Sequence, residues 1–166
     1  MSFTAVRGKK VTAECIITHK VLEDVLKTTA QSVAKYWLAS TVSVIQTGSI
    51  GAQGHFANGL AALFMATGQD VACVSEAAVG VTRMEVVNDH DLYVSVTLPN
   101  LIVGTVGGGT KFPTQQECLK ILDCEGSGKA RKFAEVCAAL LLCGELSIAA
   151  ALAEGHFTSA HQRLGR

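Results

Sequence analysis

The stretch VTRMEVVNDHDLYVSVTL, residues 81–98, decides the fold class. Its two halves, Val81–Val87 and Leu92–Leu98, are rich in residues that favour strands, and a polar Asn-Asp-His-Asp sequence separates them. Asn and Asp are typical of tight turns, so the pattern predicts an antiparallel hairpin. Pro99 is expected to end its second strand. A further strand is expected at Lys10–Ile17, where apolar and polar residues alternate.

Outside these strands, apolar residues recur at helical spacing. The expected helices cover Thr18–Trp37, about Gln53 to Thr67, Pro113–Ile121, and a long segment from about Lys129 onward. The chain therefore predicts an α/β (α+β) fold in which a mixed or antiparallel sheet is packed by long buried helices.

The segment from Phe133 to Phe157 is mostly apolar and is long enough to span a membrane. However, it contains Glu135, Glu145 and Glu154, and an unpaired carboxylate is costly inside a bilayer. We therefore expect a buried core or interface helix there, and no membrane span.

The composition excludes several classes of protein. A length of 166 residues fits one domain, and a hydrophobic content of 49% opposes disorder. The 14 basic residues are balanced by 14 acidic ones, which argues against a nucleic-acid partner. The charged content of 17% is below the usual value of about 25%, so we expect a homo-oligomer that buries apolar surface.

The cysteines do not form a disulfide or zinc pattern. The chain contains Cys15, Cys73, Cys118, Cys124, Cys137 and Cys143, without a CxxC pair. The first residues show no apolar signal segment. We expect reduced, mostly buried thiols in a cytoplasmic protein that has no metal site.

A glycine-rich run, GTVGGGT at 104–110, follows the hairpin. Consecutive glycines let backbone N–H groups approach a ligand, but the run is neither a GxGxxG nor a P-loop sequence. On its own it is a weak signal for a nucleotide. Asp70 in a Gly-Gln-Asp turn, and the histidines His55, His156 and His161, are each also compatible with a purely structural or surface role.

Taken together, several blocks occur in an order and spacing that resemble a known family. The blocks are GSIG at 48–51, HFAN at 55–58, GQD at 68–70, DLYVSVTLPNLIVGTVGGGT at 91–110, CGELSIAAALAEGH at 143–156, and His161. From about Arg7 onward the chain resembles the C-terminal part of the catalytic domain of the hydroxymethylglutaryl-CoA (HMG-CoA) reductase family. The resemblance implies a single truncated domain over residues 1–166, without the small NADPH-binding subdomain.

The family reduces a thioester with NADPH and uses a Glu, a Lys, an Asp and a His. By resemblance, Asp70 matches the aspartate that tunes the lysine, and His161 matches the histidine that protonates the departing thiolate. His55 and Asn58 match positions near the substrate. The motif associated with NADPH comprises Gly104, Thr105, Gly107, Gly108 and Gly109.

The chain also departs from the family pattern. The stretch at 36–41 lacks the family's substrate-binding lysine, and the stretch at 71–76 lacks its amide pair. The upstream glutamate motif, the lysine loop and the nucleotide subdomain have no counterpart. Without the lysine, no cation is available to stabilise an oxyanion, a loss of about 10²–10³ in rate.

These departures lead to three hypotheses. The first is a repurposed enzyme of specialised metabolism, which promotes a cofactor-free cyclisation or isomerisation of an apolar terpenoid or polyketide, for example of the Diels–Alder type. It would bind its substrate near Tyr36, Trp37 and Phe56, and it would need no cofactor. The second is a fragment or subunit of a reductase that uses NADPH and needs another chain. The third is a non-catalytic interaction protein.

Overall fold

A computed structural model of the chain describes residues 7–164, except the side chains at positions 159–161 and 164. Its centre is a three-stranded antiparallel sheet in the order β1-β3-β2, formed by β1 (Lys9–Ile17), β2 (Val81–Val87) and β3 (Asp91–Leu101). The predicted hairpin and the predicted α+β class are both confirmed.

The prediction that Pro99 ends the hairpin's second strand is wrong, because β3 continues to Leu101. Lys9 pairs with Leu101 and Val11 pairs with Leu98, so β3 carries one extra residue between these pairs. Pro99 lies in this bulge, where the ladder does not need its missing N–H.

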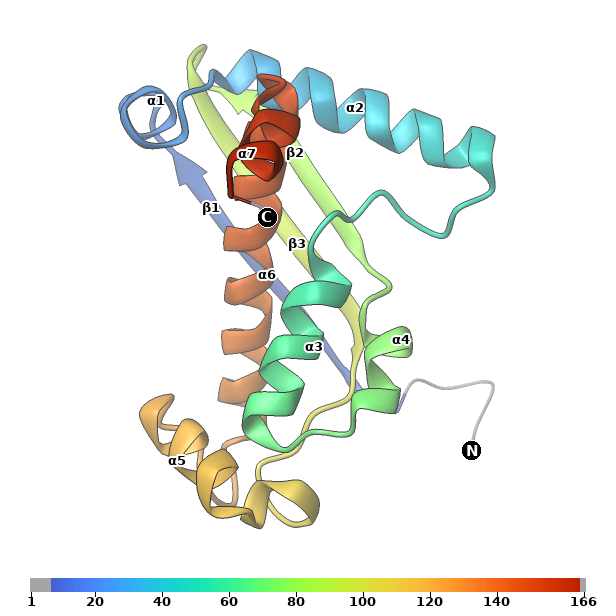
Figure 1. Cartoon of the computed structure of the whole chain (residues 1–166), viewed down its shortest axis with the longest axis vertical. Helices are drawn as coiled ribbons and strands as arrows, with labels where there is room; N and C mark the ends of the chain where they lie inside the picture. The colour runs from blue at the N-terminus through green and yellow to red at the C-terminus, as the bar shows by residue number, and fades with distance from the viewer. Residues whose placement is uncertain (1–6, 165–166) are drawn as a thin grey trace.

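The helices lie between and after the strands. They are α1 (His19–Val21), the π-helical segment η1 (Leu22–Leu26), α2 (Ala30–Thr47), α3 (Phe56–Thr67), the 3₁₀ segment η2 (Val71–Cys73), α4 (Val74–Ala77), the 3₁₀ segment η3 (Gly108–Lys111), α5 (Pro113–Ile121), α6 (Ala130–Ala153) and α7 (His156–Leu164). In Figure 1, α6 and α3 lie in front of the sheet, α5 lies at the bottom, and α2 extends to the side at the top. The helices thus form one layer on one face of the sheet.

The helix expected over Thr18–Trp37 is interrupted. Lys27 adopts a left-handed conformation with φ of 55°, which ends the first helical segment. Thr29 then begins α2 as its N-cap, because its hydroxyl accepts a hydrogen bond from the Ser32 N–H at 3.1 Å. Apolar spacing alone does not reveal this break, because it continues through both segments.

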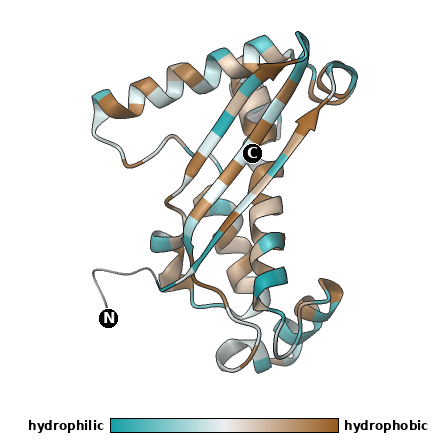
Figure 2. Ribbon diagram, turned by 180° about the vertical axis from the view of Figure 1, so that it is seen from behind, coloured by the Kyte–Doolittle hydropathy of each residue, from teal (hydrophilic) through white to brown (hydrophobic). Residues whose placement is uncertain are grey.

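The opposite face of the sheet carries mostly polar side chains, beside the exposed Ile16 and Val81. None of the described helices covers it, as the view from behind shows (Figure 2). Tyr93 donates a hydrogen bond to Glu14, and Arg83 lies over the Tyr93 ring at 5.5 Å. Antiparallel sheets commonly have one packed and one solvated face, which explains the alternation of the strands.

Helix α6 forms the main support of the core. Its length and composition would allow it to cross a membrane, but it packs against the sheet and against α2 and α3. Phe133, Cys137 and Leu141 on this helix are fully buried. The expectation of a core helix is therefore confirmed.

All six cysteines are free. Burial raises the pKa of the Cys137 thiol to about 12, so this group behaves as a small apolar side chain. Cys143 is exposed, although it belongs to the same apolar run, because it lies on the outer side of α6. The expectation of mostly buried thiols is wrong for this residue.

Candidate functional site

The Gly-Gln-Asp turn and the glycine-rich run lie against each other. Gly68 ends α3 with a φ of 70°, and a Cβ on it would overlap the carbonyl group of Gly109. Gln69 adds a polar contact, because its Oε1 accepts a hydrogen bond from the Gly104 N–H at 2.9 Å. Two segments that are far apart in the sequence thus form one surface.

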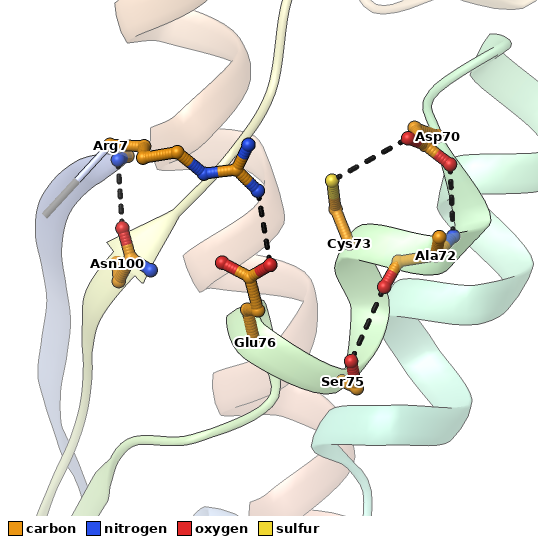
Figure 3. A network of polar contacts seen from close by, with 8 residues as sticks. Arg7, Asp70, Ala72, Cys73, Ser75, Glu76 and Asn100 are labelled. Atoms are coloured by element: carbon orange, nitrogen blue, oxygen red, sulfur yellow. Dashed lines mark hydrogen bonds and ion pairs between the residues drawn. The ribbon is translucent and has the colours of Figure 1, made fainter. Parts of the chain in front are cut away.

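Asp70 lies at the start of η2 and is exposed. Its Oδ1 accepts a hydrogen bond from the Ala72 N–H at 3.0 Å, and its Oδ2 accepts one from the Cys73 thiol at 3.8 Å, as Figure 3 shows. The carboxylate is therefore held in one orientation by its own turn, and remains accessible to another group.

Cys73 lies within the stretch where the resemblance expects an amide pair. Burial, followed by the charge of Asp70, raises the pKa of the Cys73 thiol. The thiol is therefore protonated at neutral pH and acts as a hydrogen-bond donor to Asp70, not as a nucleophile.

Two contacts hold the segment that leads into β1, one to α4 and one to β3 (Figure 3). Arg7 forms an ion pair with Glu76 of α4 at 3.0 Å, and the Gly8 N–H donates to Asn100 Oδ1 at 2.7 Å. Both side chains of the ion pair are more than two-fifths exposed, so we expect it to contribute only about 0–1 kcal/mol. Its main effect is to hold α4 beside the start of β1.

Threonines hold the glycine-rich run in place. Thr105 is buried, and its hydroxyl donates to the Gly126 carbonyl at 2.7 Å. The Thr110 hydroxyl donates to the Gly107 carbonyl at 2.5 Å. Both side chains are therefore engaged with the backbone and hold the run in its conformation.

A cavity of about 360 Å³ lies between the turn and the run. It is lined by Phe64, Met65, Gly68, Gln69, Asp70, Gly108, Gly109, Phe112 and Gln115. Gly107 and Gly108 have positive φ values, and a Cβ on either would have nothing within 4 Å, so a ligand can approach their backbone. Among the side chains that the structure describes, no group of three or more His, Cys, Asp and Glu residues could hold a metal ion.

His55 and Asn58 lie at the other end of α3. This helix has 12 residues, which corresponds to about 18 Å. Asp70 follows its C-terminal end, so the described chain does not bring His55 and Asp70 into contact. The structure does bring Asp70 and the predicted Gly108 and Gly109 to the same cavity.

The three aromatic residues predicted to bind an apolar substrate serve different parts of the fold. Trp37 donates from its indole nitrogen to the Thr82 carbonyl at 2.9 Å, which attaches α2 to β2. Tyr36 is half-buried, and burial together with the charge of Glu145 raises its pKa. Phe56 is fully buried, and it borders a separate cavity of about 250 Å³ beside Ile50 and Val79.

The side chain of His161 lies outside the described residues, so its predicted role remains a prediction.

Two residues contribute to these sites without having been predicted. Gln69 connects the turn to the glycine-rich run. Glu145 is only 4% exposed, and it accepts hydrogen bonds from the N–H groups of Gly54 and His55. The signal for Glu145 was its position as a carboxylate within a long apolar run, where a buried charge needs partners.

Comparisons with known proteins agree with the resemblance. The family model described as hydroxymethylglutaryl-coenzyme A reductase matches residues 1–166. The chain is 48% identical to the 3-hydroxy-3-methylglutaryl-coenzyme A reductase of Methanocaldococcus jannaschii, over 96% of this chain and 40% of that protein. It is 46% identical to that of Pyrococcus horikoshii, over 100% of this chain and 42% of that protein.

A more distant relative is 3-hydroxy-3-methylglutaryl-coenzyme A reductase 1 of Dictyostelium discoideum, at 38% identity over 100% of this chain and 32% of that protein. The chain thus spans about two-fifths or less of the length of these relatives. On these grounds the chain belongs to the HMG-CoA reductase family.

Proposed function

We propose that this chain is the part of an NADPH-dependent HMG-CoA reductase that supplies Asp70 and the glycine-rich run. The rest of a longer chain, or a separate partner chain, supplies the remaining catalytic groups. The observation that carries this proposal is the direct contact between the Gly68–Asp70 turn and Gly104–Gly109, which places a fixed carboxylate beside an accessible backbone.

NADPH would supply one hydride in each of two steps, so that two hydrides and two protons convert the thioester carbon to a primary alcohol as the carbon–sulfur bond breaks. The chain's own residues bind and orient. The backbone of Gly107 and Gly108 would be open to the nucleotide, because a Cβ on either meets nothing within 4 Å. The Phe112 ring, which is 63% exposed, would offer an apolar surface in the cavity that Gly108 also lines. Asp70, held by Ala72 and Cys73, is available to pair with a lysine.

The separation of His55 and Asp70 by about 18 Å along α3 supports a site shared between polypeptides. By the resemblance, His55 matches a position near the substrate and Asp70 matches the aspartate that tunes the lysine. A second polypeptide that lies along this helix would bring its own groups to both ends. No specific observation favours a cyclisation.

The test of this proposal uses a chimera, in which the chain replaces the matching two-fifths of the Methanocaldococcus jannaschii reductase. We expect the chimera to oxidise NADPH in the presence of HMG-CoA, whereas the 166-residue chain alone should not. Asp70→Asn in the chimera should lower kcat by about 10²–10³-fold, because it removes the charge that stabilises the lysine.

The matched control is Asp24→Asn, an exposed carboxylate on η1. This variant should keep the kcat of the chimera. A chimera that folds and assembles but does not oxidise NADPH would show that the departures at 36–41 and 71–76 have abolished reductase activity, and the proposal would fail.

We also propose that the chain forms a homo-oligomer. The second half of α2 and the loop after it expose Leu38, Val42, Ile45 and Ile50, the last two at 78% and 84%. This part of α2 extends from the body of the molecule, and apolar residues recur along it (Figures 1 and 2). Exposed apolar surface of this extent is typical of an interface.

We therefore expect light scattering at micromolar concentration to give at least twice the monomer mass of 17.4 kDa. Ile45→Asp should shift the mass to that of the monomer, because it places a charge in the interface. The control is Ile121→Asp, since Ile121 on α5 is equally exposed at 83% but lies outside this surface. A monomeric wild-type chain would contradict the expectation.

A further inference from the structure

The imidazole of His55 is held between two helices at positions that have no side chain. A Cβ on Gly59 of α3 would lie 2.6 Å from its Cε1 atom, and a Cβ on Gly144 of α6 would overlap its Nδ1 atom. The ring edge that carries Nδ1 therefore faces α6, and only glycine at position 144 leaves room for it.

The Nδ1 atom is buried and has no hydrogen-bond partner among the described residues. A proton on this nitrogen would have no acceptor among the described residues, and the close approach of Gly144 leaves little room beside it. The proton of the neutral ring is therefore placed on Nε2, because the environment of one ring nitrogen determines the state of the other.

The residue after Gly144 fixes the backbone of the same histidine. The buried Glu145 carboxylate accepts hydrogen bonds from the N–H groups of His55 at 2.6 Å and Gly54 at 3.2 Å. His55 is the N-cap of α3, but its side chain makes no capping hydrogen bond. Glu145 provides this cap from another helix, where a negative charge also interacts favourably with the helix dipole.

We propose that Gly144 and Glu145 form a two-residue seat on α6 that positions His55. The seat holds its imidazole as the Nε2–H tautomer, so that this N–H donates a hydrogen bond to an acceptor atom of an acyl ligand. This inference rests on the proposed function for the identity of the ligand. The seat itself is a property of the described chain, and Gly144 and Glu145 are positioning residues.

The first test measures the ring nitrogen chemical shifts of His55 in the isotope-labelled 166-residue chain at pH 7.5. We expect one unprotonated nitrogen, Nδ1, and one protonated nitrogen, Nε2. Averaged shifts typical of two exchanging tautomers would overturn the proposal.

The second test changes the seat. Gly144→Ala should displace the ring and average the two nitrogen shifts, and it should lower the Tm, although alanine favours a helix more than glycine does. In a His55→Ala background the same substitution should raise the Tm, because no ring remains to be displaced. The opposite signs of the Tm change in the two backgrounds isolate the contact between position 144 and His55. A Tm change of the same sign in both backgrounds would contradict the seat.

Glu145→Gln tests the second residue of the seat. Both partners of the carboxylate are N–H donors, so the amide must direct its own N–H group at one of them. We expect the Tm to fall by about 5 °C and the nitrogen shifts of His55 to change. Glu135→Gln, an exposed carboxylate on the same helix, should change neither. Unchanged shifts in Glu145→Gln would overturn the role of Glu145.

In the chimera, Glu145→Gln should lower kcat by about 10–100-fold, because a misplaced donor loses its alignment with the substrate. An inactive chimera whose His55 shifts still respond to Gly144→Ala and Glu145→Gln would refute the reductase proposal and leave the seat in place. An active chimera whose shifts do not respond would refute the seat alone.

Discussion

Gly68→Ala is expected to lower the free energy of unfolding by about 3 kcal/mol. A residue other than glycine at the observed φ of 70° costs about 1–2 kcal/mol. In addition, the new Cβ would overlap the carbonyl group of Gly109, and such overpacking costs a further contribution of about 1–3 kcal/mol. Because the neighbour is backbone, the two loops must separate, and the Asp70 turn would move away from the glycine-rich run.

The matched control for this variant is Gly48→Ala. Gly48 also ends a helix, at a φ of 71°, but a Cβ added to it would have nothing within 4 Å. In this variant the free energy of unfolding should fall only by the conformational contribution, about 1–2 kcal/mol. Urea unfolding of both variants measures the difference between them, and equal losses would show that the loops do not touch.

Phe133→Ala is expected to cost about 3–5 kcal/mol of unfolding free energy. Phe133 is fully buried near the start of α6 and belongs to the hydrophobic core. Removal of its ring loses the transfer free energy of the ring and leaves a cavity that the packed elements fill only in part. Since small domains have about 5–15 kcal/mol of stability in total, this variant should be close to unfolding at 25 °C.

Phe112→Ala provides the comparison for this loss. The ring of Phe112 is 63% exposed, so its removal should change the free energy of unfolding by less than about 0.5 kcal/mol. Thermal unfolding monitored by circular dichroism distinguishes the two variants. Similar losses at both positions would mean that Phe133 does not belong to the core. If Phe112 contacts the nucleotide, its variant should also raise the KM for NADPH in the chimera.

The main elements of the fold could be predicted from local patterns. Two strand-favouring segments around a polar turn predicted the hairpin, and Pro113 and Thr114 predicted the start of α5. The break at Lys27–Thr29 was not predictable from spacing, because the apolar period continues across it. The extension of β3 past Pro99 depends on a bulge opposite β1, which is a property of strand pairing.

The candidate site, like the fold, could be predicted only in part from the sequence. The sequence by itself determined the family, and with it the candidate roles of Asp70 and Gly104–Gly109, because these motifs are contiguous and their order is specific. Only the tertiary structure decided that Gly68 lies against Gly109, and that Gln69 accepts a hydrogen bond from the Gly104 N–H.

The seat around His55 also required the tertiary structure. In the sequence, Glu145 is one of several carboxylates in an apolar run and Gly144 is an interruption of a helix. Their contact with His55 joins residues about 90 positions apart, and neither periodicity nor composition records such contacts. Backbone hydrogen bonds and close glycine contacts between distant segments depend on how the helices pack, so they arise only once the chain has folded.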